Sequence, residues 1–262
     1  MKCHVTGMFW TLDKKAKPFL ELTKEDKSKE YVHLKRNTTI KVLNEFGKKC
    51  TGYFENGEHK ICPDNLTINY GKQCSVCRSK DSFNICASCD GSKCSATEDV
   101  MKKCLSTTHF LYLVLIGEKV KVGITSAGRY LKRWIEQGAD YACLIGSDNG
   151  LNIRALEKNM AKEVTDRIST SAKIKSFMKD DRELLAAFLK EKNMETNITN
   201  VRKFYEGLDS IPKTPCVHEG LVNGRVVCVK GKILIFENNE NYYYYDLNNL
   251  IGEVVDAEFT YN

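Results

Sequence analysis

The fold of the central part of the chain is decided by the segment FLYLVLIGEKVKVGIT, residues 110–125. Its first seven residues form a continuous apolar run, which is typical of a strand buried on both faces. Residues 119–125 alternate between apolar and polar side chains, with the period of two expected for a strand. Because Gly117 and Glu118 separate these two stretches, the segment predicts a β-hairpin.

The residues after this hairpin predict a helix, a strand and two further helices. A helix fits residues 129–137, because Gly138 is a typical residue after a helix end, and a short strand fits residues 141–145. Apolar residues then recur at spacings of three and four, as in an amphipathic helix: Ile153, Leu156, Met160 and Val164. A last helix fits residues 181–192, and this order of elements indicates an α/β domain over residues 106–200.

Both ends of the chain contain short β-prone pieces separated by turn residues. We therefore expect an α+β multidomain protein. Residues 1–70 would form a β-rich domain, residues 71–105 a cysteine-rich zinc ribbon, and residues 201–262 a β-rich segment that packs with residues 1–70. The two ends would then close one barrel or sandwich around the middle of the chain.

The composition of the 262 residues, with 42% hydrophobic and 28% charged, excludes a disordered or collagen-like chain. No apolar run is long enough to span a membrane, and the first residues lack the apolar core of a signal peptide. We expect a cytoplasmic protein with no membrane partner. The net charge is +6, with the basic excess before residue 206 and an acidic segment after it, which is compatible with a polyanion such as nucleic acid.

Twelve cysteines in a chain without secretion features favour a metal site over disulfides. Two C-x2-C pairs, eight residues apart, supply four of them: Cys74, Cys77, Cys86 and Cys89. Two such pairs make a tetrahedral cage of four thiolates, which predicts a structural zinc ion with no open catalytic position. An iron–sulfur cluster or a redox-active pair is the alternative.

Three further residues continue the cysteine-rich stretch at other spacings, namely Cys94, Cys104 and His109. They form a candidate second metal site if Cys62 or Cys50 supplies the fourth ligand. In the alternative interpretation the cysteines are buried thiols, and His109 caps the strand that follows it.

The central domain resembles the GIY-YIG nuclease superfamily. Tyr112, in FLY, stands where that family has G-I-Y, and the KVG of Lys121 to Gly123 stands where it has Y-I-G. Arg133 matches the family's helix arginine, and Glu157 matches its metal-binding glutamate. The resemblance implies an α/β fold and a catalytic set made of these tyrosine, lysine, arginine and glutamate side chains.

The superfamily's chemistry assigns a role to each residue. Tyr112 would take a proton from water, Arg133 would neutralise charge on the phosphate, and Glu157 would hold Mg²⁺ or Mn²⁺. Lys121 replaces the second family tyrosine and is a poor base unless its pKa is strongly lowered. The candidate nucleic-acid-binding residues are Lys121, Arg129, Lys132 and Arg133.

The wider layout resembles an uncharacterised family, the domain of unknown function numbered 2797. The string RWIEQGA, residues 133–139, together with the two C-x2-C pairs and the KVGIT hairpin, carries this resemblance. It implies no established activity.

We therefore expect a zinc-containing protein that binds nucleic acid and cleaves phosphodiester bonds with a divalent metal ion. RNA is slightly favoured over DNA, because zinc ribbons and small β-barrels recur in RNA-handling proteins. The alternatives are a non-catalytic RNA-binding module and a cysteine-based interaction or redox protein. The sequence leaves the oligomeric state open.

Overall fold

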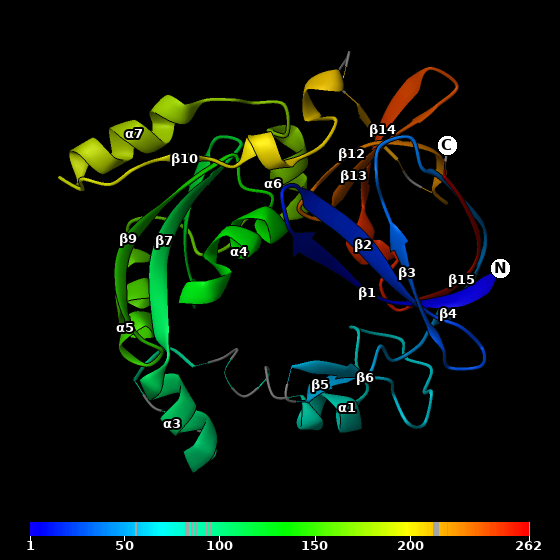
Figure 1. Ribbon diagram of the computed structural model, residues 1–262, viewed down its shortest axis with the longest axis horizontal. Helices are drawn as coiled ribbons and strands as arrows, with labels where there is room; N and C mark the ends of the chain where they lie inside the picture. The colour runs from blue at the N-terminus through cyan, green and yellow to red at the C-terminus, as the bar shows by residue number, and fades with distance from the viewer. Residues whose placement is uncertain are drawn as a thin grey trace. The chain divides into compact units, whose positions relative to one another are not determined.

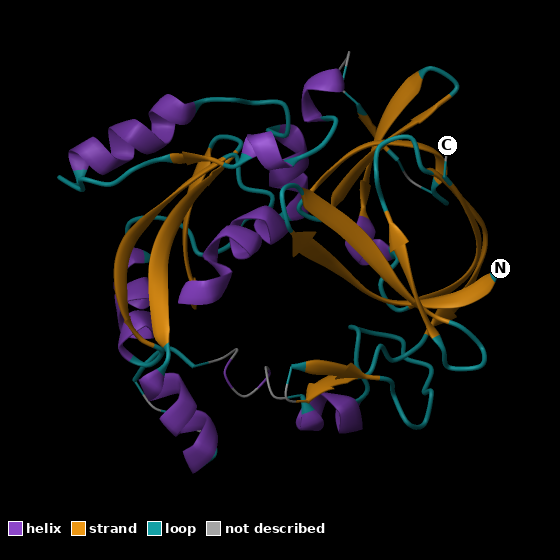
Figure 2. Cartoon of the chain, viewed as in Figure 1, coloured by secondary structure: helices purple, strands orange, loops and turns teal. Residues whose placement is uncertain are grey.

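The computed structural model describes residues 1–55, 57–81, 84, 86, 89–92, 94, 96–211, 215–218 and 220–261. The fold is mixed α+β and rich in strands (Figure 2). The chain divides into two compact units: unit 1 consists of residues 1–84 and 205–262, and unit 2 of residues 85–204. Unit 2 is thus inserted in the chain between the two parts of unit 1. None of the helices in the described stretches combines the length and the apolar character needed to cross a bilayer.

Unit 1 is organised around one sheet, which has nine strands in the described part of the chain, in the order β11-β14-β13-β12-β4-β15-β1-β2-β3. The strands and helices of unit 1 are β1 (Lys2–Leu12), β2 (Ala16–Thr23), β3 (Lys29–His33), β4 (Thr39–Lys48), the small separate hairpin β5 (Tyr53–Glu55) and β6 (Glu58–Lys60), α1 (Ser75–Lys80), β11 (Cys216–Val217), β12 (Asn223–Lys230), β13 (Ile233–Asn238), β14 (Asn241–Asp246) and β15 (Glu253–Thr260). Strand β15 lies between β4 and β1, so both ends of the chain meet in this sheet (Figure 1).

Apolar runs and turn residues in the sequence account for the strands in the C-terminal half of the sheet. Strand β13 buries residues 233–236 completely or nearly so, which gives it the apolar character of an inner strand. The turn to β14 places Asn239 in the left-handed region at a φ of 49°, a conformation that asparagine tolerates well. Across the sheet, the indole Nε1 of Trp10 donates to the carbonyl of Gly231 at 3.0 Å, which satisfies the buried ring nitrogen.

Unit 2 contains a smaller sheet with the strand order β10-β9-β7-β8. Its elements are α3 (Glu98–Ser106), β7 (Thr108–Ile116), β8 (Lys119–Ser126), α4 (Tyr130–Gln137), β9 (Tyr141–Asn149), α5 (Asn152–Met160), α6 (Thr170–Lys175), α7 (Arg182–Glu191) and β10 (Thr199–Asn200). Strand β7 is central and pairs with both β8 and β9 in antiparallel fashion. Strand β8 therefore forms one edge of this sheet.

Helices cover both faces of strand β7. On one face, its leucines at 111, 113 and 115 share a core with α5 and α7, which contribute Ile153 and Leu185. On the other face, the ring of Tyr112 meets the indole of Trp134 from α4 edge to face, with 6.2 Å between ring centroids. Burial on both sides explains why this strand has no polar alternation.

The elements predicted for the middle of the chain are confirmed, with shifted ends. The hairpin turns at Gly117, which has a φ of 61°. Helix α4 ends at Gly138, whose left-handed conformation caps the last turn. Strand β9 continues to Asn149, beyond the predicted end, because it pairs with the whole of β7. Helix α5 stops at Met160 rather than continuing over the apolar pattern to residue 164.

Candidate functional site

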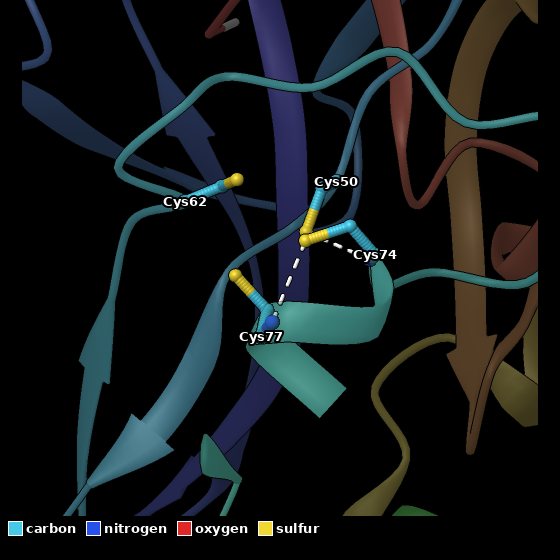
Figure 3. A group of neighbouring side chains, drawn as sticks. All are labelled: Cys50, Cys62, Cys74 and Cys77. Carbon is cyan, nitrogen blue, oxygen red and sulfur yellow. Dashed lines mark hydrogen bonds between the residues drawn. The ribbon is translucent and has the colours of Figure 1, made fainter. Parts of the chain in front are cut away.

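Four buried cysteines of unit 1 form a compact group, here called the four-cysteine cluster: Cys50, Cys62, Cys74 and Cys77. Their sulfur atoms all lie within 4.8 Å of one another. Figure 3 shows the four side chains pointing toward a common centre. Four sulfur donors in this arrangement are compatible with a tetrahedral metal site.

Local structure positions each pair of cysteines in the cluster. Cys74 caps the N-terminus of α1, and its sulfur accepts a hydrogen bond from the backbone N–H of Cys77 at 3.4 Å. The sulfur of Cys50 accepts from the N–H of Cys74 at 3.1 Å. Cys50 and Cys62 stand on either side of the β5–β6 hairpin, which folds back and brings them together. Backbone N–H donors aimed at sulfur stabilise the thiolate form that a metal requires.

The surroundings of the four-cysteine cluster do not make an ordinary apolar core. Only Tyr53 and Ile68, both partly buried, pack against it among the described hydrophobic side chains. Burial opposes ionisation of Cys74, but hydrogen bonds from the Cys77 amide and from neighbouring thiols outweigh burial and lower its pKa. Burial and the neighbouring thiols raise the pKa of Cys77. The Cys74 thiol is thus easier to ionise than an ordinary cysteine and has close sulfur neighbours, as expected for a ligand set.

The grouping of the cysteines differs from the ligand set that the spacing predicts. Cys74 and Cys77 are grouped as expected, but the places assigned to Cys86 and Cys89 are taken by Cys50 and Cys62. A tetrahedral metal site takes four thiolates, and these four cysteines already supply that number. The predicted zinc-ribbon segment, residues 71–105, is accordingly divided between the two units at residue 84.

The candidate second site also changes composition, because Cys62 belongs to the four-cysteine cluster. The remaining members, Cys94, Cys104 and His109, all belong to unit 2. Cys104 lies on α3 and His109 at the start of β7, where its Nδ1 lies 2.9 Å from the carbonyl oxygen of Thr107.

A second group in unit 2, here called the polar cluster, consists of Tyr112, Lys121, Arg133 and Glu157. These residues come from four elements, β7, β8, α4 and α5. Edge strand β8 contacts both α4 and α5, although these helices cover opposite faces of the sheet. The edge therefore lets a glutamate from one helix and an arginine from the other approach the same lysine.

Electrostatic interactions connect all members of the polar cluster. The charge of Arg133 acts on Tyr112, on Lys121 and on Glu157. Lys121 and Glu157 also act on each other with opposite sign. Tyr112, Lys121 and Glu157, which the sequence resemblance selects, therefore all lie within electrostatic range of Arg133.

Tyr112 is the buried centre of the polar cluster. Its side chain is fully buried, and its hydroxyl accepts a hydrogen bond from the Nε2 of Gln137. Burial raises the pKa of Tyr112, while the nearby Arg133 guanidinium opposes the rise. A phenol in this environment keeps its proton at neutral pH and is a weak base toward water.

Lys121 and Glu157 lie at the half-buried rim of the polar cluster. Burial lowers the pKa of Lys121, and its Nζ donates to the carbonyl oxygen of Asp166. Burial raises the pKa of Glu157, against the opposing charges of Lys121 and Arg154. Each charged group thus bears a desolvation penalty, which is common at functional sites.

Arg129, at the N-cap of α4, and Arg133, within α4, are more exposed. The side chains of Arg129 and Arg133 are 50% and 46% exposed, and both reach the same carboxylate of Glu136, at 3.3 and 3.8 Å. Lys132 lies between them in sequence and is half-buried. Exposed ion pairs of this kind are weak, so a phosphate group could replace Glu136 as the partner of either arginine.

Two residues of this site were not predicted from the sequence. Gln137 is the direct partner of the Tyr112 hydroxyl, and the charge of Asp166 acts on Glu157. Gln137 follows Arg133 by one helical turn and could have been found from that spacing. Asp166 lies in a loop, and nothing in the sequence connects it to β8.

The comparisons with known proteins agree with the whole-chain resemblance. The model of a family described as protein of unknown function (DUF2797) matches residues 31–250. No curated protein and no solved structure matches the chain. The family match includes every member of the four-cysteine cluster and of the polar cluster. The chain therefore belongs to the DUF2797 family of proteins of unknown function.

Proposed function

We propose that unit 2 binds nucleic acid and cleaves its phosphodiester bonds with the help of a divalent metal ion, as GIY-YIG nucleases do. The observation that carries this proposal is the approach of Tyr112, Lys121, Arg133 and Glu157 to one another from four separate elements. Short motifs recur by chance in unrelated sequences. A fold that brings the same four residues toward one sheet edge is much less easily explained by chance. RNA is the substrate that we propose first, on the fold-level analogy between small metal-binding modules and RNA-handling proteins.

Each member of the polar cluster has a task that fits its surroundings. Arg133 and Lys121 bind and neutralise the scissile phosphate, since both carry positive charge and Arg133 is exposed. Glu157 holds the divalent ion, with the carboxylate of Asp166 near enough to influence it. A bound Mg²⁺ or Mn²⁺ would supply Lewis-acid stabilisation of charge on the phosphate. Arg129 and Lys132 extend the basic surface along α4.

We assign Tyr112 a positioning role rather than that of the base. Its hydroxyl is fully buried and its pKa is raised by that burial, so it is not suited to take a proton from water. Its hydrogen bond with Gln137 and its ring contact with Trp134 instead fix the turn of α4 that carries Arg133.

We further propose that the four-cysteine cluster binds a structural zinc ion. Four thiolates suit zinc and leave no open position for catalysis. The hairpin between Cys50 and Cys62 and the helix that Cys74 caps are both small, which also favours a metal-stabilised segment. Iron would reveal itself by visible absorption of the purified protein, which zinc does not produce.

The proposal is tested with purified full-length protein, mixed RNA and DNA substrates, and buffers with or without Mn²⁺. In Glu157→Gln we expect cleavage to fall about a hundredfold or more, with the stability of unit 2 unchanged, because the variant removes the metal-binding charge at constant size. The matched control is Glu163→Gln, since Glu163 is an exposed glutamate that pairs with Lys192 at 2.8 Å, and it should cleave normally. Unchanged cleavage in Glu157→Gln would overturn the nuclease assignment.

The second candidate is a non-catalytic nucleic-acid-binding module. It is favoured by Lys121 at the position of the second family tyrosine and by the complete burial of Tyr112. Under this alternative no Mg²⁺ or Mn²⁺ condition gives cleavage, yet the binding constant falls steeply as the salt concentration rises. Arg133→Gln should reduce the slope of log affinity against log salt concentration by about one phosphate contact. Binding that is absent or independent of salt would exclude both candidates.

A further inference from the structure

We propose that unit 2 has a metal site of its own, made by the four thiolates of Cys86, Cys89, Cys94 and Cys104. This inference goes beyond the proposed function, because it concerns neither the polar cluster nor the four-cysteine cluster of unit 1. The protein would then bind two structural metal ions, one in each unit.

The chain position of these cysteines supports a separate site. Cys86 and Cys89 form a C-x2-C pair that the four-cysteine cluster does not use. All four residues belong to unit 2, since the boundary between the units falls at residue 84. Two adjacent thiolates on a tight turn and two more supplied further along the chain are a common zinc arrangement.

The segment that holds Cys89 is fixed against the first turns of α5. The carbonyl oxygen of Cys89 accepts a hydrogen bond from the Nη1 of Arg154 at 3.0 Å. The next residue, Asp90, forms an ion pair with Lys158 at 2.6 Å. Both cationic partners lie on α5, one helical turn apart, so they hold residues 89 and 90 along this helix.

Cys104, on α3, is fixed at the neighbouring turn. Its carbonyl accepts a hydrogen bond from the N–H of Gly150 at 2.9 Å. Its sulfur lies so close to Gly150 that a β-carbon at that position would be 2.5 Å from it, which only glycine avoids. Because Gly150 and Arg154 are one turn apart, Cys89 and Cys104 are attached to the same end of α5.

The other two thiols lie within electrostatic range of Cys104. The thiols of Cys86, Cys89 and Cys94 all act on the Cys104 thiol. The Arg154 guanidinium lies within the same range and carries the opposite charge to a thiolate. A cage of four thiolates around a divalent ion carries a net charge of about −2, which Arg154 is placed to offset.

The four residues do not form an apolar core. All four cysteines are partly exposed, in contrast to the buried Cys143 of the same unit. Helix α3, which carries Cys104, has no buried residue along its length. A helix that buries nothing needs another source of stability, and a metal ion bound through Cys104 would supply it.

His109 is not included in the proposed ligand set. Its ring packs against Gly150 beside Cys104, but its Nδ1 lies 2.9 Å from the carbonyl of Thr107. We assign it a position next to the site, where it supports the turn that holds Cys104.

The test is metal content per chain, measured by elemental analysis and native mass spectrometry on the full-length protein. We expect two ions per chain in the wild type, one in Cys104→Ser, one in Cys74→Ser and none in the double variant. Cys216→Ser, which changes an exposed cysteine outside both groups, should retain two. One ion per chain that is lost in Cys74→Ser and kept in Cys104→Ser would overturn the proposal. Because these outcomes do not involve nucleic acid, they are independent of the nuclease test.

Cadmium substitution gives a second measurement that does not depend on variants that fold poorly. We expect two cadmium NMR signals, both in the range of four-sulfur coordination, and no loss of either signal in His109→Asn. A single signal, or a second signal typical of three sulfurs and one nitrogen that disappears in His109→Asn, would overturn the four-thiolate assignment.

Discussion

The ring of Tyr112 lies directly over Gly123, its cross-strand partner on β8. A β-carbon at position 123 would lie 2.6 Å from the Cζ of Tyr112. Only a residue without a side chain therefore permits the buried tyrosine to lie across the hairpin. The glycine of the KVG motif is explained by this close approach, since its own φ is not in the left-handed region.

Gly123→Ala should accordingly destabilise unit 2 by about 1–3 kcal/mol, the usual effect of overpacking a buried site. The chain has two tryptophans, Trp10 in unit 1 and Trp134 in unit 2, so urea unfolding followed by Trp134 fluorescence in a Trp10→Phe background measures this effect. The matched control is Gly146→Ala on β9, where an added β-carbon meets only the Cβ of Leu111 at 3.9 Å. Equal stability of the two alanine variants would contradict this explanation.

The ion pair between Asp140 and Arg202 should be essential to unit 2. Asp140 is fully buried, receives the Nη1 of Arg202 at 2.7 Å, and accepts the N–H of Gly117 at 2.8 Å. Asp140→Ala leaves a largely buried guanidinium and a backbone amide without this partner, so we expect unit 2 to lose about 3–5 kcal/mol of stability, measured by the same unfolding assay. Asp180→Asn changes a half-exposed carboxylate that also faces Arg202, and it should change the stability by less than about 1 kcal/mol.

Unit 1 should lose stability in acid through Glu21. Burial raises the pKa of this carboxyl, but hydrogen bonds and charge from His59 and Lys29 outweigh burial and lower it to about 2. The unfolded chain takes up the proton near the ordinary value of 4.5, so the stabilisation is complete above that pH and is lost as the pH falls toward 2. The loss is about 2–3 kcal/mol.

Urea unfolding of unit 1 at several pH values, followed by Trp10 fluorescence in a Trp134→Phe background, measures this dependence. In Glu21→Gln the free energy of unfolding of unit 1 should change less between pH 4.5 and 2 than in the parent protein. Glu30→Gln, which removes an exposed partner of Lys24, should leave the profile of the parent protein. A wild-type profile in Glu21→Gln would show that another group is responsible.

Removal of the metal proposed for the four-cysteine cluster should destabilise unit 1 more than any single surface change. A strong chelator, or Cys62→Ser, leaves sulfur atoms close together without a cation, and we expect the Trp10 unfolding transition to shift to lower urea concentration. Cys228→Ser is the matched control, because Cys228 is equally buried in unit 1 but lies outside the four-cysteine cluster. If the chelator leaves the transition unchanged, the four-cysteine cluster does not bind a stabilising metal.

The central hairpin and helices could be predicted from the sequence because their signals are local. The apolar run of β7, the alternation of β8 and the glycine after α4 each act within a few residues. The end of α5 could not be predicted in this way. Its apolar pattern continues to Val164, but the backbone leaves the helix and the carbonyl of Thr165 accepts a hydrogen bond from Val122 at 3.0 Å, which is a tertiary contact.

The grouping of the cysteines illustrates the same limit. The two C-x2-C pairs are visible by spacing, but the spacing does not say which pair joins which partner. Cys50 and Cys62 are brought to Cys74 by the β5–β6 hairpin and by the position of α1, neither of which has a strong sequence signal. The polar cluster was accessible only through family resemblance, since nothing local relates Lys121 to Glu157.

The division of unit 1 into two parts of the chain has a consequence for synthesis on the ribosome. Strand β4 pairs with β12 and β15, and β1 pairs with β15, so the sheet lacks inner strands until the last part of the chain has been made. Unit 2 is continuous and can fold while those strands are still missing. The N-terminal strands of the nascent chain therefore have unpaired edges during that interval. They must be protected from pairing with other strands if the protein is to fold correctly.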